Sequence, residues 1–286
     1  MDAAVDRRTQ LERDGFVVVR DFLAAEEIDR LRGVVSRFFR KGGVLFHLGK
    51  TQPNAAIECP DLAFLFSEPK VVDLFREVFA QDDILFTGHC DIHEDVFSRW
   101  HKDTHDSAYF EESCFTPDCR IYKMGVYLQD HPRTGGLTVR PGSHRKPEMD
   151  SGPGIHLGSR AGDVIVFDVR LDHHGRAPDA VDQGLHWLSQ AIKKGLGAIF
   201  PALRQPGDVA FVHRLKRGYE ALIGRPRKQS VFFTFGAPNR FSHQFARASM
   251  ARQLRQYEGQ PASYPEGLVD RLRAAGVEVY QPETVA

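Results

Sequence analysis

The feature that most constrains this sequence is the segment Trp100-His101-Lys102-Asp103, together with a second histidine much further along at His173. In an extended strand, residues i and i+2 point to the same face, so His101 and Asp103 can reach one metal ion while Lys102 points away. Two imidazoles and one carboxylate on one face of an iron ion form the facial triad of non-haem Fe(II) oxygenases. The pattern therefore predicts an iron site carried by a β scaffold.

A single His-x-Asp triplet is weak evidence, because the chain has 13 histidines and contains a second such triplet at residues 93–95 (HED). Trp100 precedes the later triplet, as expected of a half-buried strand that holds metal ligands rigidly. The earlier triplet ends a run dense in carboxylates, which we interpret as a solvated turn or strand end. The third ligand is expected just past a predicted strand at 164–167, where His173 and His174 are both candidates.

Length, charge and cysteine usage limit the class of protein. The chain has 286 residues, and its 38 basic and 38 acidic side chains balance, so nucleic acid is not expected as a partner. The N-terminus lacks an apolar signal core and no stretch reaches membrane-spanning length, so a cytoplasmic location is predicted. The 4 cysteines form no C-x-x-C pair, which favours free thiols over a zinc site.

The pattern of apolar residues predicts a mainly β chain with flanking helices. Short β-rich runs separated by Gly- and Pro-rich turns are typical of a sandwich or jelly roll. Helical spacing appears before these runs and again after residue 180. The expected strands lie at 16–19, 84–87, 121–128, 137–139, 164–167 and 229–235, and the expected helices at 24–39, 69–79, 185–199 and 242–258, the last ending at Gly259.

The ordered motifs resemble those of the phytanoyl-CoA dioxygenase (PhyH-like) family of Fe(II)/2-oxoglutarate-dependent oxygenases. The similar segments are 14–18 (DGFVV) with the helix that follows, 100–103 (WHKD), 135–144 (GGLTVRPGSH), Gly162-Asp163 followed by His173, and 227–232 (RKQSVF). The spacing after Gly162 favours His173 over His174 as the third ligand. The resemblance runs from the N-terminus to about residue 240.

The resemblance implies a double-stranded β-helix (jelly roll, cupin-like) with helices flanking one side. It implies a metal site of His101, Asp103 and His173, and the cofactors Fe(II), 2-oxoglutarate and O₂, with stimulation by ascorbate. The far carboxylate of 2-oxoglutarate needs a cation, for which the planar guanidinium of arginine is well suited. Arg227 matches the family position, and Arg225 is the alternative.

The chain departs from the family pattern between His173 and Arg227, which are separated by many more residues than usual. We therefore expect a single domain over residues 1–286 with an inserted basic helical segment at about 180–226. Residues 183–228 hold nine Lys or Arg against two acids, a net charge of +7. Three interpretations stay open for it: a surface lid packed on the barrel, recognition of an anionic substrate, or peripheral contact with acidic lipid.

The predicted activity is hydroxylation of an unactivated C–H bond of a small organic substrate, with no catalytic residue beyond the metal ligands. Desaturation or ring formation by the same iron chemistry is an open alternative. Two other classes compete with it: a jelly-roll metal isomerase or hydrolase that does not use 2-oxoglutarate, and a non-catalytic binding module on the same fold. Release of succinate discriminates among them.

Overall fold

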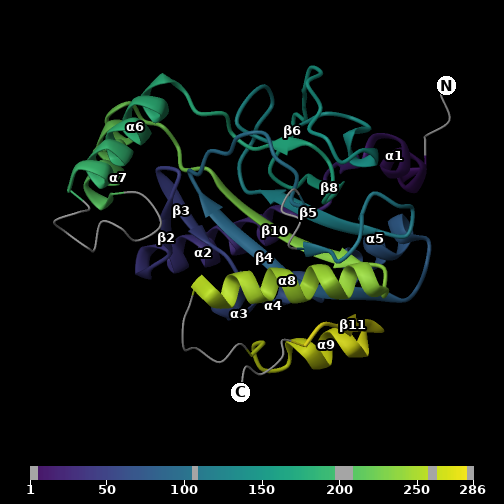
Figure 1. The fold of residues 1–286 in the computed structure, drawn as a ribbon. Helices are drawn as coiled ribbons and strands as arrows, with labels where there is room; N and C mark the ends of the chain where they lie inside the picture. The colour runs from purple at the N-terminus through teal and green to yellow at the C-terminus, as the bar shows by residue number, and fades with distance from the viewer. Residues whose placement is uncertain (1–5, 105–108, 197–208, 257–262, 282–286) are drawn as a thin grey trace.

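Two antiparallel sheets form the centre of the computed structural model, which describes residues 6–104, 109–196, 209–256 and 263–281 (Figure 1). The larger sheet has the strand order β1-β8-β5-β10-β4-β3-β2, with β11 added parallel to β4. Its strands are β1 (Phe16–Val19), β2 (Val44–Phe46), β3 (Gly49–Gln52), β4 (Ile84–Glu94), β5 (Ile121–Tyr127), β8 (Val164–Asp168), β10 (Gln229–Gly236) and β11 (Val277–Val279).

The smaller sheet has the order β7-β6-β9 and faces the larger one. It consists of β6 (Thr138–Val139), β7 (Ile155–His156) and β9 (His173–His174), with the short helix η3 (Ser143–Arg145) between β6 and β7. An isolated antiparallel bridge between His101 and His173 adds one more segment to its edge. From β4 onward the chain passes back and forth between the two sheets, which is the winding of the predicted double-stranded β-helix.

Helices cover the outer face of the larger sheet (Figure 1). The long α2 shows why the local sequence is helical: Ile28, Leu31 and Val35 recur on one buried face, and Glu27 accepts a hydrogen bond from the N–H of Ala24 at 2.7 Å. The helices on the two sides of the barrel region are α1 (Arg7–Asp14), α2 (Ala25–Lys41), α3 (Ala55–Glu58), η1 (Pro60–Leu62), α4 (Ala63–Phe66), α5 (Pro69–Phe79), α8 (Arg240–Gln256) and α9 (Leu268–Ala274).

None of the helices in the described ranges is long and apolar enough to cross a bilayer. All four cysteines are buried and free of disulfides, in agreement with the prediction of free thiols.

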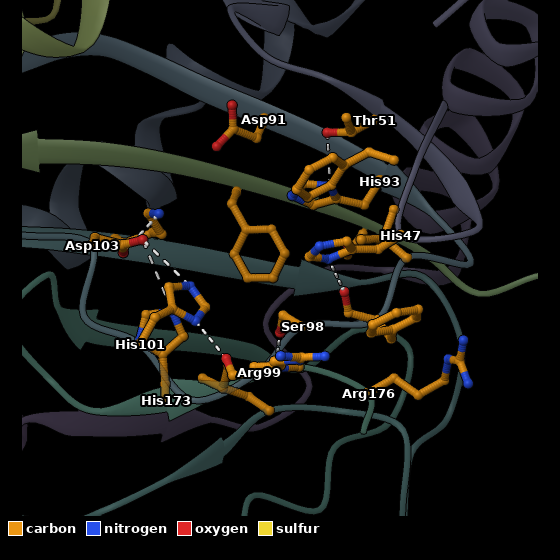
Figure 2. Close-up of a pocket in the computed structure, with 18 of the residues that line it drawn as sticks. His47, Thr51, Asp91, His93, Ser98, Arg99, His101, Asp103, His173 and Arg176 are labelled. Atoms are coloured by element: carbon orange, nitrogen blue, oxygen red, sulfur yellow. Dashed lines mark hydrogen bonds and ion pairs between the residues drawn. The ribbon is translucent and has the colours of Figure 1, made fainter. Parts of the chain in front are cut away.

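A cavity of about 1310 Å³ lies between the sheets (Figure 2). Side chains alternate along a strand, so each strand of the larger sheet has one row facing this cavity and one row facing the helices. In β10, Ser230 and Phe232 line the cavity, whereas Val231 and Phe233 belong to the core beneath the helices. This alternation decides which polar side chains can reach the site.

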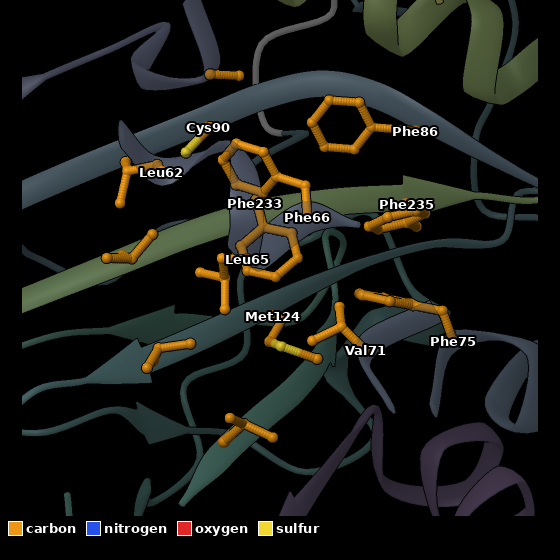
Figure 3. Close-up of a cluster of buried hydrophobic side chains, with 14 of the residues drawn as sticks. Leu62, Leu65, Phe66, Val71, Phe75, Phe86, Cys90, Met124, Phe233 and Phe235 are labelled. Carbon is orange, nitrogen blue, oxygen red and sulfur yellow. The ribbon is translucent and has the colours of Figure 1, made fainter. Parts of the chain in front are cut away.

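The main core lies between the larger sheet and helices α2 to α5 (Figure 3). Phe75 of α5 stacks on Phe235 of β10 with ring centroids 4.4 Å apart, and Phe66 of α4 packs edge-on against Phe233. Each of these rings is almost fully buried. Such aromatic pairs add to the free energy gained by burying apolar area, so the sheet that carries the cavity is held rigidly from behind.

Helices α6 (Ala180–Leu196) and α7 (Ala210–Leu222) form the inserted segment and pack beside β2 and β3 (Figure 1). Leu185, Leu188 and Ile192 of α6 contact a small core that contains Leu48, Phe97 and Val212. The apolar stripe predicted from the sequence thus packs on the barrel, although its last member, Ile199, lies outside the described residues. Gly259, the predicted end of α8, also lies outside them.

Candidate metal centre

The side chains of His101, Asp103 and His173 meet at the wall of the cavity (Figure 2). One potential ligand atom from each residue lies within 4.8 Å of the other two. The Nε2 atoms of His101 and His173 are 4.0 Å and 3.9 Å, respectively, from Oδ1 of Asp103. The three side chains are close enough to share one metal ion, and no other group of this kind occurs among the described residues.

Backbone pairing explains how residues so far apart in sequence come together. The N–H of His101 donates to the carbonyl of His173 at 3.0 Å, and the N–H of His173 donates back to the carbonyl of His101 at 2.9 Å. The N–H of Asp103 donates to the carbonyl of Val169 at 3.0 Å. The spacing of i and i+2 then turns His101 and Asp103 toward the same side.

Hydrogen bonds on the other ring nitrogens prepare both histidines for a metal. Nδ1 of His101 lies 2.7 Å from the carbonyl of Arg99, and Nδ1 of His173 lies 2.9 Å from the carbonyl of Leu171. A carbonyl can only accept, so Nδ1 carries the proton and Nε2 presents a lone pair toward Asp103. Two bare imidazole nitrogens and a carboxylate are a donor set that fits Fe(II).

The surrounding charges set the protonation states that a metal requires. Burial acts to raise the pKa of Asp103, but the positive charge of Lys123, joined by His173 and His101 in their protonated forms, outweighs it and holds the pKa well below its usual value. The ammonium of Lys123 lies 2.8 Å from Oδ2 of Asp103. Burial lowers the pKa of His173 to about 3. At neutral pH, Asp103 is ionised and His173 is neutral, which are the protonation states in which these two side chains bind a metal.

Lys102 points away from the metal centre, as the alternation predicts, and fastens the segment to the scaffold. Its ammonium pairs with Oδ1 of Asp172 at 2.8 Å and donates to the carbonyls of Ser143 at 2.6 Å and Arg170 at 2.8 Å. Both charged side chains are fully buried. The turn at residues 141–144 (PGSH) therefore supports the segment that carries His101 and Asp103.

Arg227, the residue predicted to bind 2-oxoglutarate, is not among the residues that line the cavity. Its side chain is 53% exposed, and its guanidinium lies 3.5 Å from Glu94. Arg225 pairs with Asp179 at 3.0 Å and is also absent from the lining. Arg227 lies two residues before β10, and its guanidinium is paired with Glu94 at the end of β4.

Lys228 is the basic residue at the start of β10 that lines the cavity. Among the described residues no carboxylate forms an ion pair with it, and burial, together with the charges of Arg176 and Arg225, lowers its pKa. Gly135 makes room for this side chain, because a Cβ there would lie 2.5 Å from Nζ of Lys228. The sequence contains a signal for it: Lys228 has the same parity as Ser230 and Phe232, which line the cavity, whereas Val231 and Phe233 face the core.

The prediction that residues 91–95 are solvated is wrong. Glu94 ends β4 as expected, but it is 5% exposed and Asp95 is 6% exposed. Oδ2 of Asp95 accepts from Arg217 of α7 at 2.5 Å, so the inserted helices cover this strand end. The sequence suggests solvent exposure because the basic partners of Glu94 and Asp95, Arg227 and Arg217, lie more than one hundred residues further along the chain.

Several basic side chains of the inserted segment are engaged in ion pairs inside the protein. Arg217 pairs with Asp95, and Arg225 with Asp179. Lys216 is buried and lies 3.4 Å from Asp182 and 3.6 Å from Glu220. Part of the positive charge of this segment is therefore neutralised by ion pairs inside the protein. Recognition of an anionic substrate or of acidic lipid stays a prediction.

Together, the double-stranded β-helix and the paired histidines and carboxylate define the class of the non-haem iron oxygenases. The profile of the phytanoyl-CoA dioxygenase (PhyH) family matches residues 11–178. The chain belongs to this family, and it is an iron- and 2-oxoglutarate-dependent oxygenase, as the motifs predicted. The match covers the metal centre and ends just before α6.

Solved structures support the same fold. EctD from S. alaskensis, solved with bound Fe, has a TM-score of 0.55 and 17% identity, and the alignment covers 82% of this chain and 77% of that one. The non-heme alpha ketoglutarate dependent epimerase SnoN from nogalamycin biosynthesis has a TM-score of 0.53 and 15% identity, with 80% of each chain covered. HygX from Streptomyces hygroscopicus, solved with nickel and 2-oxoglutarate, has a TM-score of 0.52 and 14% identity, covering 82% of this chain and 88% of that one. A comparison with curated protein sequences finds no match.

Proposed function

We propose that His101, Asp103 and His173 hold Fe(II), and that the protein hydroxylates an unactivated C–H bond of a small organic substrate. The observation that carries the proposal is the pair of Nε2 atoms turned toward one carboxylate oxygen, with each Nδ1 committed to a backbone carbonyl. Among solved structures of similar fold, EctD has been solved with iron and with 2-oxoglutarate, and HygX has been solved with 2-oxoglutarate. These ligands support the same cofactors here.

The residues of this chain prepare the site for that chemistry. Bound Fe(II) would supply activation of O₂, coupled to conversion of 2-oxoglutarate to succinate and CO₂. Asp103 stays ionised at neutral pH, so the ligand set carries one negative charge. Leu137, Phe167 and Phe232 give the cavity apolar walls, which exclude water from a reactive centre.

The direct test is an anaerobic titration of the protein with Fe(II) and 2-oxoglutarate, read by the visible charge-transfer band. Admission of O₂ with a panel of small organic molecules then measures succinate release. We expect the band to form and at least one substrate to stimulate succinate release and gain one oxygen atom. Product formation without succinate would favour a metal isomerase or hydrolase, and absence of both band and turnover would favour a binding module.

We propose Lys228, in place of Arg227, as the cation for the far carboxylate of 2-oxoglutarate. Lys228→Ala is expected to raise the Kd for 2-oxoglutarate about tenfold to a hundredfold, because a charge-assisted hydrogen bond is lost. Arg227→Ala is the matched control, since this neighbouring cation lies outside the cavity lining. Calorimetric titration of 2-oxoglutarate into the metal-loaded variants measures both values. A larger effect at Arg227 would reinstate the prediction made from the family pattern.

We also propose that the chain works as one catalytic domain, although the family match ends at residue 178. The later strand β10 lies between β4 and β5 and pairs with both along most of its length. Removing it would open the sheet that forms the cavity floor. Helices α6 and α7 then serve as an insertion between β9 and β10 that closes one end of the site.

A further inference from the structure

The cavity has a second polar group on the wall formed by β4. His89, Asp91 and His93 share the inward face of this strand, because Cys90 and Ile92 between them belong to the outer core. Figure 2 shows Asp91 and His93 on the side of the cavity opposite His101 and His173. These residues hold no place in the metal centre and are not needed for 2-oxoglutarate binding as proposed above.

His89 and Asp91 form a pair with unused hydrogen-bonding capacity. Nε2 of His89 lies 3.3 Å from Oδ2 of Asp91, and the two side chains are 4% and 17% exposed. Nδ1 of His89 and Oδ1 of Asp91 are both buried and have no hydrogen-bond partner among the described residues. Buried polar atoms without partners cost free energy in folding, so their presence beside a cavity points to a ligand that satisfies them.

The charge of this pair defines what it would bind. Burial acts to raise the pKa of Asp91, but His89 and Lys123 outweigh it and hold the pKa well below its usual value. The ammonium of Lys123 is itself committed to Asp103 at 2.8 Å. Burial lowers the pKa of His93 to about 4, so His93 is neutral and bonds to Thr51 at 3.0 Å through Nδ1. Asp91 is therefore an ionised carboxylate with one oxygen free for a hydrogen-bond donor.

Aromatic rings beside the pair suit the same kind of ligand. The ring of Phe245 lies 5.7 Å from that of His89, and Tyr109 stacks on Phe245 with centroids 5.4 Å apart. The guanidinium of Arg252 lies 5.6 Å from the ring of Tyr109, so this ring already contacts one cation. A carboxylate next to aromatic faces is a common arrangement for recognising an ammonium group.

We propose that His89 and Asp91 bind a protonated amine of the primary substrate and thereby hold it across the cavity from the metal centre. The inference deepens the proposed oxygenase function and rests on it. It assigns the substrate class as amine-bearing molecules, in place of the anionic class suggested by the charge of the inserted segment.

The test compares three probes with one carbon skeleton: n-butylammonium, n-butanol and butyrate. Each is titrated calorimetrically into the anaerobic protein loaded with Fe(II) and 2-oxoglutarate, so no turnover is needed. We expect n-butylammonium to bind at least about tenfold more tightly than the other two. Asp91→Asn, which keeps the shape and removes the charge, should weaken ammonium binding about tenfold or more while the charge-transfer band is unchanged. Asp29→Asn, on the exposed side of α2, is the matched control and should bind like wild type.

The outcomes separate this inference from the proposed function. Equal or tighter binding of butyrate or butanol to the wild type overturns the inference without any variant. Unchanged ammonium affinity in Asp91→Asn, with normal loading, also overturns it and leaves the oxygenase function intact. Failure of the wild type to form the Fe(II)–2-oxoglutarate band overturns the proposed function, and the inference with it.

Discussion

Replacing His173 by alanine is expected to abolish turnover and to weaken Fe(II) binding by at least about a hundredfold, because one of three protein ligands is lost. The remaining His101 and Asp103 cannot enclose the ion, and His101 is the more exposed of the two histidines, with 41% of its side chain accessible. Metal content after dialysis and the charge-transfer band with 2-oxoglutarate measure the effect directly.

His174→Ala is the matched control for this prediction. His174 is the adjacent residue on the same strand, but it faces away from the metal centre and packs edge-on against Trp100 with ring centroids 4.5 Å apart. We expect this variant to retain metal and 2-oxoglutarate binding. If His174→Ala lost the metal and His173→Ala kept it, the assignment of the third ligand would be wrong.

Replacing Lys102 by methionine is expected to destabilise the protein by about 3–5 kcal/mol, the usual cost of removing one partner of a buried ion pair. Asp172 would remain fully buried and would lose the ammonium at 2.8 Å, so that the guanidinium of Arg140, 3.8 Å from Oδ2, would be its remaining cation. The same change removes the hydrogen bond to Ser143, so the PGSH turn would no longer fasten the strand of the metal centre. Equilibrium unfolding in urea measures the loss in the apo-protein.

Two comparisons make the Lys102 result specific. Asp29→Ala breaks an exposed ion pair with Arg32 and should change the free energy of unfolding by no more than about 1 kcal/mol. The double variant Lys102→Met with Asp172→Asn should recover part of the loss, because no unpaired charge stays buried. If Asp29→Ala and Lys102→Met lowered the free energy of unfolding equally, the buried ion pair of Lys102 and Asp172 would not be a major source of stability.

The sequence predicted the scaffold well where the signal is local. The strand at 16–19 and the helix at 69–79 have the predicted bounds, and the strands at 121–128 and 164–167 differ from β5 and β8 by one residue. These elements bury regular apolar rows, so their period is visible without tertiary information. Short elements such as β2, β3 and α3 were missed, because three or four residues carry no period.

Helix α7 lies within the helical segment predicted at about 180–226, but its own bounds were not predicted, and its sequence shows why. Its buried face carries Lys216 and Glu220 beside Val212, while Phe211 and Leu222 on other faces are exposed. The usual rule that apolar residues face inward therefore indicates the wrong face. The ion pairs with Asp182 and Asp95 hold this helix together with the packing of Val212 in the small core beside α6.

The sequence by itself determined the family, the β scaffold and the three residues proposed to hold iron, because an i, i+2 spacing and a distal histidine are local constraints on one strand and one turn. Tertiary structure showed that Lys228 lines the cavity, whereas Arg227 pairs with Glu94 outside the lining. It also decided that the carboxylates of β4 are enclosed. Burial and charge pairing depend on partners from distant segments, and a linear pattern does not contain the distances between them.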